Sequence, residues 1–141
     1  PALELPLLAT QAGGPQSTSL KTHSGKVVLI DFWATHCAPC KAQMPVIQRI
    51  YDSSDKNRFT VLSVNLDFLE EKERRKTVAS YIEGGGFTFD VALGQNDLLS
   101  KWHIKRIPFM VLVDPQGHVA STHTGLRSEE RLRTEIEGLI H

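Results

Sequence analysis

Residues 26–45 read KVVLIDFWATHCAPCKAQMP, and they include both cysteines of the 141-residue chain. The run 26–33 is apolar except at its first position and at Asp31, and it is rich in β-branched and aromatic residues. Such a run is typical of a strand buried on both faces of a sheet. Over 41–51 the apolar side chains recur at helical spacing, which predicts a helix with a kink at Pro45. The two cysteines therefore fall where a strand ends and a helix begins.

The segment Cys37-Ala38-Pro39-Cys40 has the spacing of a redox-active disulfide. Two residues between the cysteines allow a disulfide across the first helical turn. The free N–H groups and the positive dipole end of the helix favour a thiolate at the first sulfur. We therefore expect Cys37 to be the attacking nucleophile and the more buried Cys40 to resolve the mixed disulfide. A zinc site would need two further ligands at suitable spacing, and so short a loop would stabilise the fold little as a purely structural disulfide.

Asp31 and Pro108 are the other two candidates for a catalytic role. Asp31 interrupts a strand that otherwise reads as fully buried, and it stands six residues before Cys37. A buried carboxylate without a partner has a raised pKa, so Asp31 is suited to relay a proton to or from Cys40. The alternative is that its side chain points outward from an edge strand. Pro108 directly precedes the apolar run 109–113, which by itself indicates a proline at the start of a strand.

The rest of the chain predicts short alternating elements. Alternating leucines near the start and a polar return segment at 18–20 predict a hairpin within residues 1–25. The order after this hairpin is β-α-β-α-β-α-β-β-α, which indicates an α/β fold with a mixed sheet and helices on both faces. The elements expected after the first helix are a strand at 59–66, a helix at 70–83, a strand at 87–93, a helix at 97–103 capped by Asn96, strands at 110–113 and 118–124, and a final helix capped by Ser128.

Composition narrows the function further. At 15.7 kDa the chain has the size of one domain, and we take residues 1–141 as a single domain. Lys and Arg number 16 and Asp and Glu number 16, so the formal charge is zero and the basic footprint of a nucleic-acid binder is missing. No apolar run approaches the roughly 18 residues needed to span a bilayer. Because the chain starts at Pro1 rather than Met, we expect a trimmed chain, which leaves room for a signal peptide or a membrane anchor before it.

The motifs DFWATHCAPC and IPFMVLVDPQGHV, together with the proline five residues after the second cysteine, resemble the thioredoxin superfamily. The resemblance covers about residues 25–140. It implies that the Ile107–Pro108 peptide bond is cis and faces the cysteine pair. It also implies that Asp31 is the buried acid that transfers protons, and that Trp33 lies under the active-site loop.

Three features are similar to the TlpA/ResA-type branch, the extracytoplasmic thiol-disulfide reductases. They are the N-terminal hairpin, the stretch GKVVLIDFWATHCAPCKAQMP, and a helix-strand insertion at about residues 68–93. The chain departs from the pattern of this branch at His36, where Trp is usual, and at Gln43, where Glu is frequent. The branch often carries an acid near the end of the second strand, for which Asp67 and Glu70 are the candidates.

The resemblance implies a thiol-disulfide oxidoreductase that exchanges disulfides with protein substrates. The reducing direction is favoured, because Ala-Pro between the cysteines resembles the Gly-Pro of thioredoxin. Electrons reside on the sulfurs, so we expect no cofactor and no metal, and the expected partners are protein disulfides and an upstream dithiol electron donor. The catalytic residues expected are Cys37, Cys40, Asp31 and Pro108, and the substrate contacts expected are Trp33, His36, Ala38, Pro39 and Ile107.

The resemblance also implies a compartment. We expect a periplasmic or otherwise extracytoplasmic monomer with a part in cytochrome c maturation, linked to a membrane only through an anchor before Pro1, and the cytoplasm is the second choice. Two other functions stay open. One is a copper-handling protein of the thioredoxin fold that uses the cysteines and a histidine. The other is a thiol peroxidase of the same fold, which is weakened because both cysteines lie in one CxxC.

Overall fold

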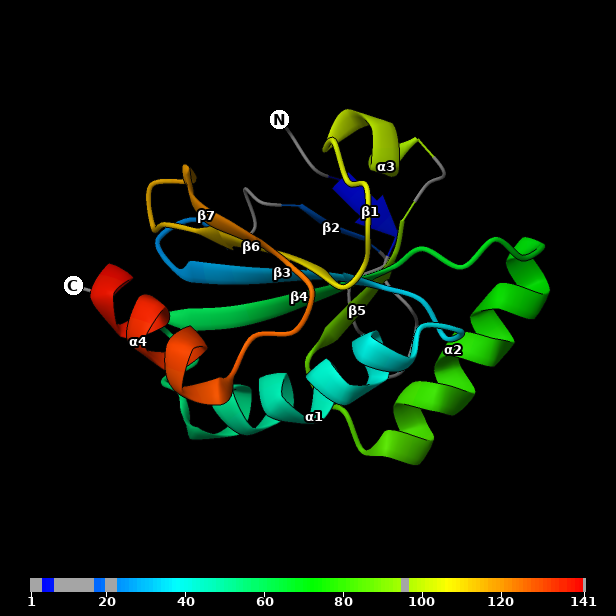
Figure 1. Cartoon of the computed structure of the whole chain (residues 1–141), viewed down its shortest axis with the longest axis horizontal. Helices are drawn as coiled ribbons and strands as arrows, with labels where there is room; N and C mark the ends of the chain where they lie inside the picture. The colour runs from blue at the N-terminus through cyan, green and yellow to red at the C-terminus, as the bar shows by residue number, and fades with distance from the viewer. Residues whose placement is uncertain (1–3, 7–16, 20–22, 95–96, 141) are drawn as a thin grey trace.

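A five-stranded mixed sheet forms the centre of the computed structural model, which describes residues 4–6, 17–19, 23–94 and 97–140. Its strand order is β5-β4-β3-β6-β7 (Figure 1). The first three strands of this order are parallel, β6 runs antiparallel to β3, and β7 runs antiparallel to β6. The predicted α/β fold with a mixed sheet is therefore confirmed. The strands are β3 (Val27–Trp33), β4 (Phe59–Asn65), β5 (Asp90–Leu93), β6 (Phe109–Val113) and β7 (Val119–Thr124).

The central strand β3 is buried along its whole length, because helices cover both of its faces. Side chains alternate across a strand, so successive residues enter different cores. Leu29 and Trp33 pack in the core that also holds residues of α1, α2 and α4, whereas Ile30 and Phe32 pack in the core on the side of α3. Figure 1 shows α1 and α4 below the sheet and α3 above it. The helices are α1 (Ala38–Ser53), α2 (Glu71–Gly85), α3 (Leu98–Lys101) and α4 (Glu129–Leu139).

Helix α1 begins three residues earlier than its apolar periodicity predicts, at Ala38 rather than at residue 41. Cys37 occupies the N-cap position, and its sulfur accepts a hydrogen bond from the backbone N–H of Cys40 at 3.3 Å. Pro39 stands in the first turn, where a missing N–H costs no intrahelical bond. The helix is continuous through Pro45. The cysteine pair therefore spans the N-cap and the first turn of α1.

The predicted insertion forms α2 and β5, and β5 pairs in parallel with β4 at the edge of the sheet. Strand β5 is shorter than predicted, because residues 87–89 precede the ladder instead of joining it. Gly86 follows the last residue of α2 and caps it, and its φ of 71° is the left-handed conformation that glycine adopts most easily. Helix α3 is also shorter than predicted, covering Leu98–Lys101. The predicted cap Asn96 lies outside the described residues.

The N-terminal hairpin is confirmed as a separate antiparallel pair of strands, β1 (Glu4–Pro6) and β2 (Ser17–Ser19). The predicted turn between them lies mostly outside the described residues. At the other end of the chain Ser128 caps α4, because its hydroxyl accepts a hydrogen bond from the N–H of Arg131 at 3.3 Å. Within the described ranges, no helix has the length and apolar character needed to cross a membrane.

Candidate active site

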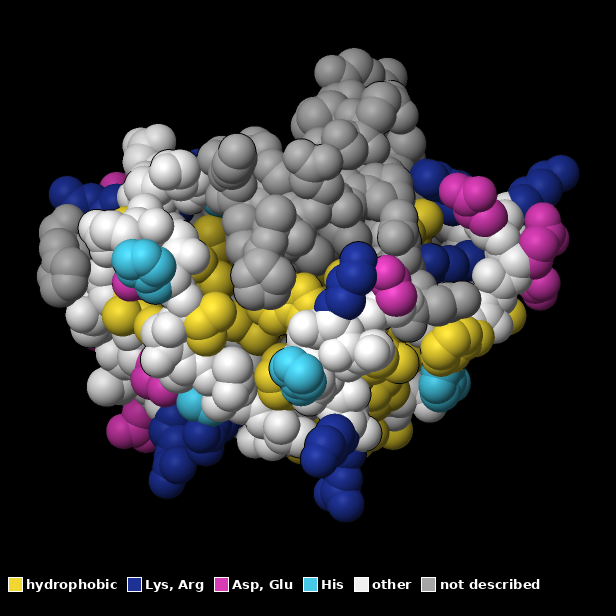
Figure 2. Space-filling model, turned by 90° about the horizontal axis from the view of Figure 1, so that it is seen from above, with side chains coloured by type: hydrophobic (Ala, Val, Ile, Leu, Met, Phe, Trp, Pro, Cys, Tyr) yellow, Lys and Arg dark blue, Asp and Glu magenta, His cyan; other side chains and the backbone are white. Residues whose placement is uncertain are grey.

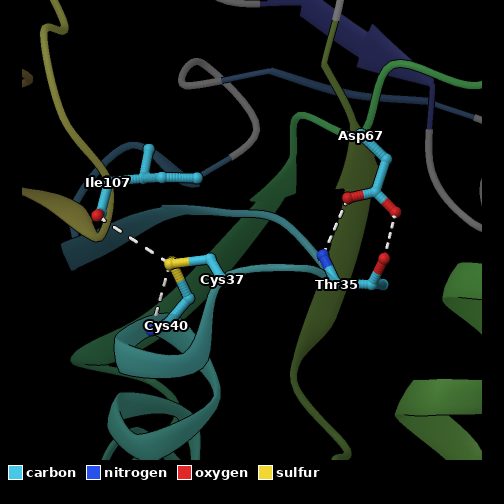
Figure 3. The surroundings of a disulfide bond; sticks show 5 residues. All are labelled: Thr35, Cys37, Cys40, Asp67 and Ile107. Atoms are coloured by element: carbon cyan, nitrogen blue, oxygen red, sulfur yellow. Dashed lines mark hydrogen bonds between the residues drawn. A yellow bond between two sulfur atoms is a disulfide. The ribbon is translucent and has the colours of Figure 1, made fainter.

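The cysteine pair forms a disulfide at the N-terminus of α1 (Figure 3). Cys40 is fully buried among the side chains of the core, whereas Cys37 is half-buried. Ala38 and Pro39 are exposed between them. A reagent approaching from solvent therefore meets the Cys37 sulfur first. The two sulfurs therefore differ in accessibility, and the attacking role of Cys37 and the resolving role of Cys40 stay a prediction.

The turn that precedes β6 meets the disulfide from the opposite side. The Ile107–Pro108 peptide bond is cis, as the resemblance implies. The carbonyl oxygen of Ile107 lies 3.8 Å from Sγ of Cys37 (Figure 3). In the disulfide this is a contact without a hydrogen, and a protonated Cys37 thiol can donate a weak hydrogen bond there. Pro108 is buried, and its carbonyl accepts a hydrogen bond from Gly125 at 2.8 Å, which ties this turn to the loop after β7.

Asp31 is fully buried on the side of the sheet that faces α1. Asp31 lies two residues from Leu29 and two from Trp33, so the three side chains point to the same face of the sheet. Leu29 and Trp33 share a core with Cys40, and the side chain of Asp31 therefore enters the same layer. Neither carboxyl oxygen has a hydrogen-bond partner among the described residues. Burial raises the pKa of Asp31 from 3.8 to about 7, because desolvation penalises the charged form. The alternative of an outward-pointing carboxylate is wrong, because β3 is the central strand and not an edge.

Other buried polar groups share that layer with Asp31. Ser63 on β4 is the register partner of Asp31, and Asn65 is the register partner of Trp33. All four residues are fully buried. The hydroxyl of Ser63, the indole N–H of Trp33 and the amide nitrogen of Asn65 have no hydrogen-bond partner among the described residues. The face of the sheet beneath the disulfide is therefore more polar than the rest of the core.

Trp33, the last residue of β3, is fully buried. Its ring packs against Tyr81 of α2 at a centroid distance of 5.4 Å. Trp33 therefore packs beneath the active-site loop, as the resemblance implies, and the substrate contact expected of it stays a prediction. His36, by contrast, is exposed immediately before Cys37.

Asp67 fixes the chain just before the cysteines, a role that the sequence did not reveal. Its two carboxylate oxygens accept hydrogen bonds from the backbone N–H of Thr35 at 2.7 Å and from the Thr35 hydroxyl at 2.6 Å (Figure 3). Asn65 in turn accepts a hydrogen bond from the N–H of Asp67 at 3.0 Å and one from Arg74 of α2 at 3.2 Å. Of the two candidate acids, Asp67 therefore touches the active-site loop. Glu70 is exposed and stands at the N-cap position of α2.

Gln43 clasps the active-site helix to the loop before α4. Its side-chain amide donates to the carbonyl of Arg127 at 3.1 Å and accepts from the N–H of Arg127 at 2.8 Å. Gln43 is fully buried, so both bonds are shielded from water. The side chain of Arg127 lies 2.7 Å from Nδ1 of His123, whose Nε2 lies 2.7 Å from Glu135 of α4. The loop before α4, which is far from α1 in the sequence, is thus held against the first turns of α1.

Among the described residues, no group of three or more His, Cys, Asp or Glu side chains is placed to hold a metal ion. The site holds two sulfurs that can exchange a disulfide, and Asp31 is buried on the face of the sheet on which Cys40 packs. An accessible sulfur at a helix N-terminus, a second sulfur within the same turn and a cis-proline opposite them define a dithiol-disulfide exchange site of the thioredoxin type.

The chain belongs to the thioredoxin-like family, whose sequence model matches residues 25–119. It is 28% identical over 121 residues to the thiol-disulfide oxidoreductase ResA of Geobacillus kaustophilus, an alignment that covers 85% of this chain and 67% of that protein. It is 27% identical over 116 residues to the sporulation thiol-disulfide oxidoreductase A of Bacillus subtilis, covering 82% of this chain and 69% of the relative.

A solved structure agrees with these relatives. The thioredoxin domain of a thiol-disulfide oxidoreductase from Bacteroides vulgatus superposes with a TM-score of 0.78 at 28% identity, covering 99% of this chain and 94% of that one. With its cysteine pair, the protein is a thiol-disulfide oxidoreductase of the same type as ResA and its sporulation relative.

Proposed function

We propose that the protein reduces disulfides in protein substrates, with Cys37 as the nucleophile. The observation that carries this proposal is the asymmetric burial of the pair: Cys37 is accessible beside the Ile107 carbonyl, while Cys40 is enclosed in the layer that holds Asp31. A sulfur at a helix N-terminus is stabilised as the thiolate, which is the attacking species. The exposed residues Ala38 and Pro39 leave the approach to Cys37 open.

The reaction starts from the dithiol form of the protein. The Cys37 thiolate attacks one sulfur of the substrate disulfide, a mixed disulfide forms, and the first substrate thiolate leaves and takes up a proton from water. Asp31 then accepts the proton of the Cys40 thiol, and the Cys40 sulfur attacks the Cys37 sulfur. The second substrate thiolate leaves and is protonated, so the substrate gains two electrons and two protons while the pair becomes the disulfide.

An upstream dithiol returns the pair to the reduced state in the reverse sequence, with two electrons and two protons. The proposed direction rests on the Ala-Pro dipeptide between the cysteines, which resembles the reducing member of the superfamily. Asp31 suits both directions, because a carboxyl whose pKa is about 7 can accept and release a proton at neutral pH. The resemblance to the TlpA/ResA-type branch supports an extracytoplasmic location and a part in cytochrome c maturation.

Trapping experiments test the proposal. The Cys40→Ser protein should accumulate mixed disulfides with protein substrates, because nothing resolves them, whereas the Cys37→Ser protein should accumulate none. The native protein should also catalyse the reduction of insulin by a small dithiol, and both variants should be inactive. Faster alkylation of Cys40 than of Cys37 in the reduced protein would reverse the assignment. Stoichiometric binding of Cu(I) without turnover would replace it with a copper-handling function.

The membrane and compartment proposals need a different experiment. The full-length gene product, including any residues before Pro1, should be expressed in a bacterium and fractionated. Recovery in the cell envelope fraction with accessible cysteines would support the extracytoplasmic proposal. Recovery of all the protein with cytoplasmic markers would contradict it.

A further inference from the structure

A small cavity opens beside the disulfide, on the side of the molecule that carries α3. Its volume is about 220 Å³. Ala34, Leu66 and Ile104 form a buried apolar floor, and Phe68 stands at its edge with 65% of its surface exposed. Figure 2 looks onto the α3 side, where hydrophobic side chains are exposed next to histidine and Lys or Arg side chains. So large an exposed ring next to an apolar hollow is typical of a binding surface.

The cavity is continuous with the redox site, because two residues belong to both. Ile107 lines the cavity, and its carbonyl is the group that contacts Sγ of Cys37. His36 lines it as well and directly precedes Cys37 in the chain. The residues beside a substrate disulfide that is in reach of Cys37 are therefore also in reach of this hollow.

The rim of the cavity is positively charged, although the whole chain has a formal charge of zero. Lys105 and Arg106 line it, and both are exposed. Within the described part of the chain neither cation has an acidic partner at ion-pair distance, and no lining residue is acidic. Asp67 lies in the chain between the lining residues Leu66 and Phe68, and both of its carboxylate oxygens accept hydrogen bonds from Thr35. These two cations are therefore available to a partner.

The size of the cavity limits what can fill it. Pockets for cofactors and drug-sized ligands span about 300–1,000 Å³, so a cavity of about 220 Å³ is too small for such a molecule and fits an amino-acid side chain. We propose that it receives an apolar side chain of a protein substrate whose adjacent residues are acidic, so that Lys105 and Arg106 select the substrates whose disulfides reach Cys37. This inference rests on the proposed function, and it names the class of substrate.

Two synthetic peptides with one disulfide each provide the test. Both carry a leucine next to a disulfide cysteine, flanked by two aspartates in one peptide and by two lysines in the other. The measured quantity is the second-order rate constant for oxidation of the reduced native protein. We expect the acidic peptide to react about fivefold faster or more, since two attractive pairs replace two repulsive ones. The difference should shrink in 1 M salt, where the screening length falls to about 3 Å.

Charge-reversal variants locate the effect. The double variant Lys105→Glu/Arg106→Glu should reverse the preference between the two peptides. The matched control is Lys56→Glu/Arg58→Glu, which makes the same change of charge before β4, at the end of the sheet opposite to the cysteines. The control should keep the preference of the native protein. Both double variants should react with a small neutral disulfide at the native rate.

The apolar part of the inference has its own pair of variants. Phe68→Ser should slow the acidic peptide that contains leucine but leave a version with serine in place of the leucine unchanged. The control is Val119→Ser, which removes another exposed apolar side chain at the far end of β7. Because both positions are exposed, neither change removes a buried contact of the core.

The outcomes separate the two proposals. Exchange with both peptides at equal rates, or an unchanged preference in Lys105→Glu/Arg106→Glu, would overturn the inference and leave the proposed function standing. No exchange with either peptide or with insulin would overturn both. An equal loss of reactivity toward oxidised glutathione in the double variant would replace a protein segment with a small anionic disulfide as the occupant, and would also overturn the inference.

Discussion

Replacing Asp31 with Asn tests the buried acid by its effect on stability. Desolvation raises the pKa of this carboxyl from 3.8 to about 7. Between these two values the folded protein holds a proton that the unfolded chain has released. The free energy of unfolding therefore falls as the pH rises. At about 1.4 kcal/mol per pH unit, the loss reaches about 4 kcal/mol once the pH passes 7.

The Asn side chain is neutral at every pH, so Asp31→Asn should lack this loss. Relative to the native protein, the variant should gain up to about 4 kcal/mol in free energy of unfolding as the pH rises from about 4 to about 8. The measurement is urea unfolding of the oxidised proteins at several pH values within that range. The same variant should resolve mixed disulfides more slowly, because the Cys40 thiol loses its proton acceptor.

The control for this experiment is Asp52→Asn on α1. Asp52 is exposed and accepts a hydrogen bond from Gln48 that an Asn oxygen can also accept, so this variant makes the same chemical change without the burial. If the difference between Asp31→Asn and the native protein were constant across the pH range, the carboxyl would have an ordinary pKa. The proton-relay role would then be refuted together with the reasoning from burial.

Three further variants test the contacts around the disulfide. Gln43→Ala removes both hydrogen bonds to the backbone of Arg127 and leaves buried groups unpaired, so urea unfolding should show a free energy of unfolding lower by about 2–4 kcal/mol. A decrease below about 0.5 kcal/mol would mean that water takes the place of the two hydrogen bonds. Thr35→Val removes the hydroxyl that donates one of the two hydrogen bonds to Asp67, so the free energy of unfolding should fall by about 1–3 kcal/mol and insulin reduction should be slower. A native free energy of unfolding with a native rate would show that Asp67 does not position the loop. His36→Trp removes a group that can carry a positive charge next to the nucleophile, so the reduction potential against glutathione should fall by up to about 30 mV; an unchanged potential with altered substrate affinity would leave only a steric role.

The local parts of the fold and the site could be predicted from the sequence. The strand, the cysteines and the helix follow one another along the chain, so apolar periodicity and spacing were enough to place them. Asp31 stood out because a single carboxylate in a buried strand is rare. Helix α1 was predicted too short, because its first turn is held by Cys37 at the cap and by Pro39 rather than by an apolar stripe.

The contacts that hold the site together could not be predicted, because their partners lie far apart in the chain. Thr35 and Asp67 are 32 residues apart, and Gln43 and Arg127 are 84 residues apart. Gln43 bonds only to backbone groups of its partner, which every residue type except proline provides in full. Such a contact leaves no trace in the identity of the partner residue. Only the tertiary arrangement of β4, α1 and the loop before α4 reveals it.

The polar layer beneath the disulfide has a consequence for heat resistance. Asp31, Ser63, Trp33 and Asn65 each keep a buried polar atom without a partner among the described residues, and each such atom costs about 1–3 kcal/mol. Apolar replacements at Asp31 and Ser63 are thus the most direct route to a thermostable variant, and the replacement at Asp31 removes the proton acceptor that the proposed exchange needs. Selection for a higher melting temperature alone should therefore enrich changes in this layer and yield proteins that outlast the native one while exchanging disulfides more slowly.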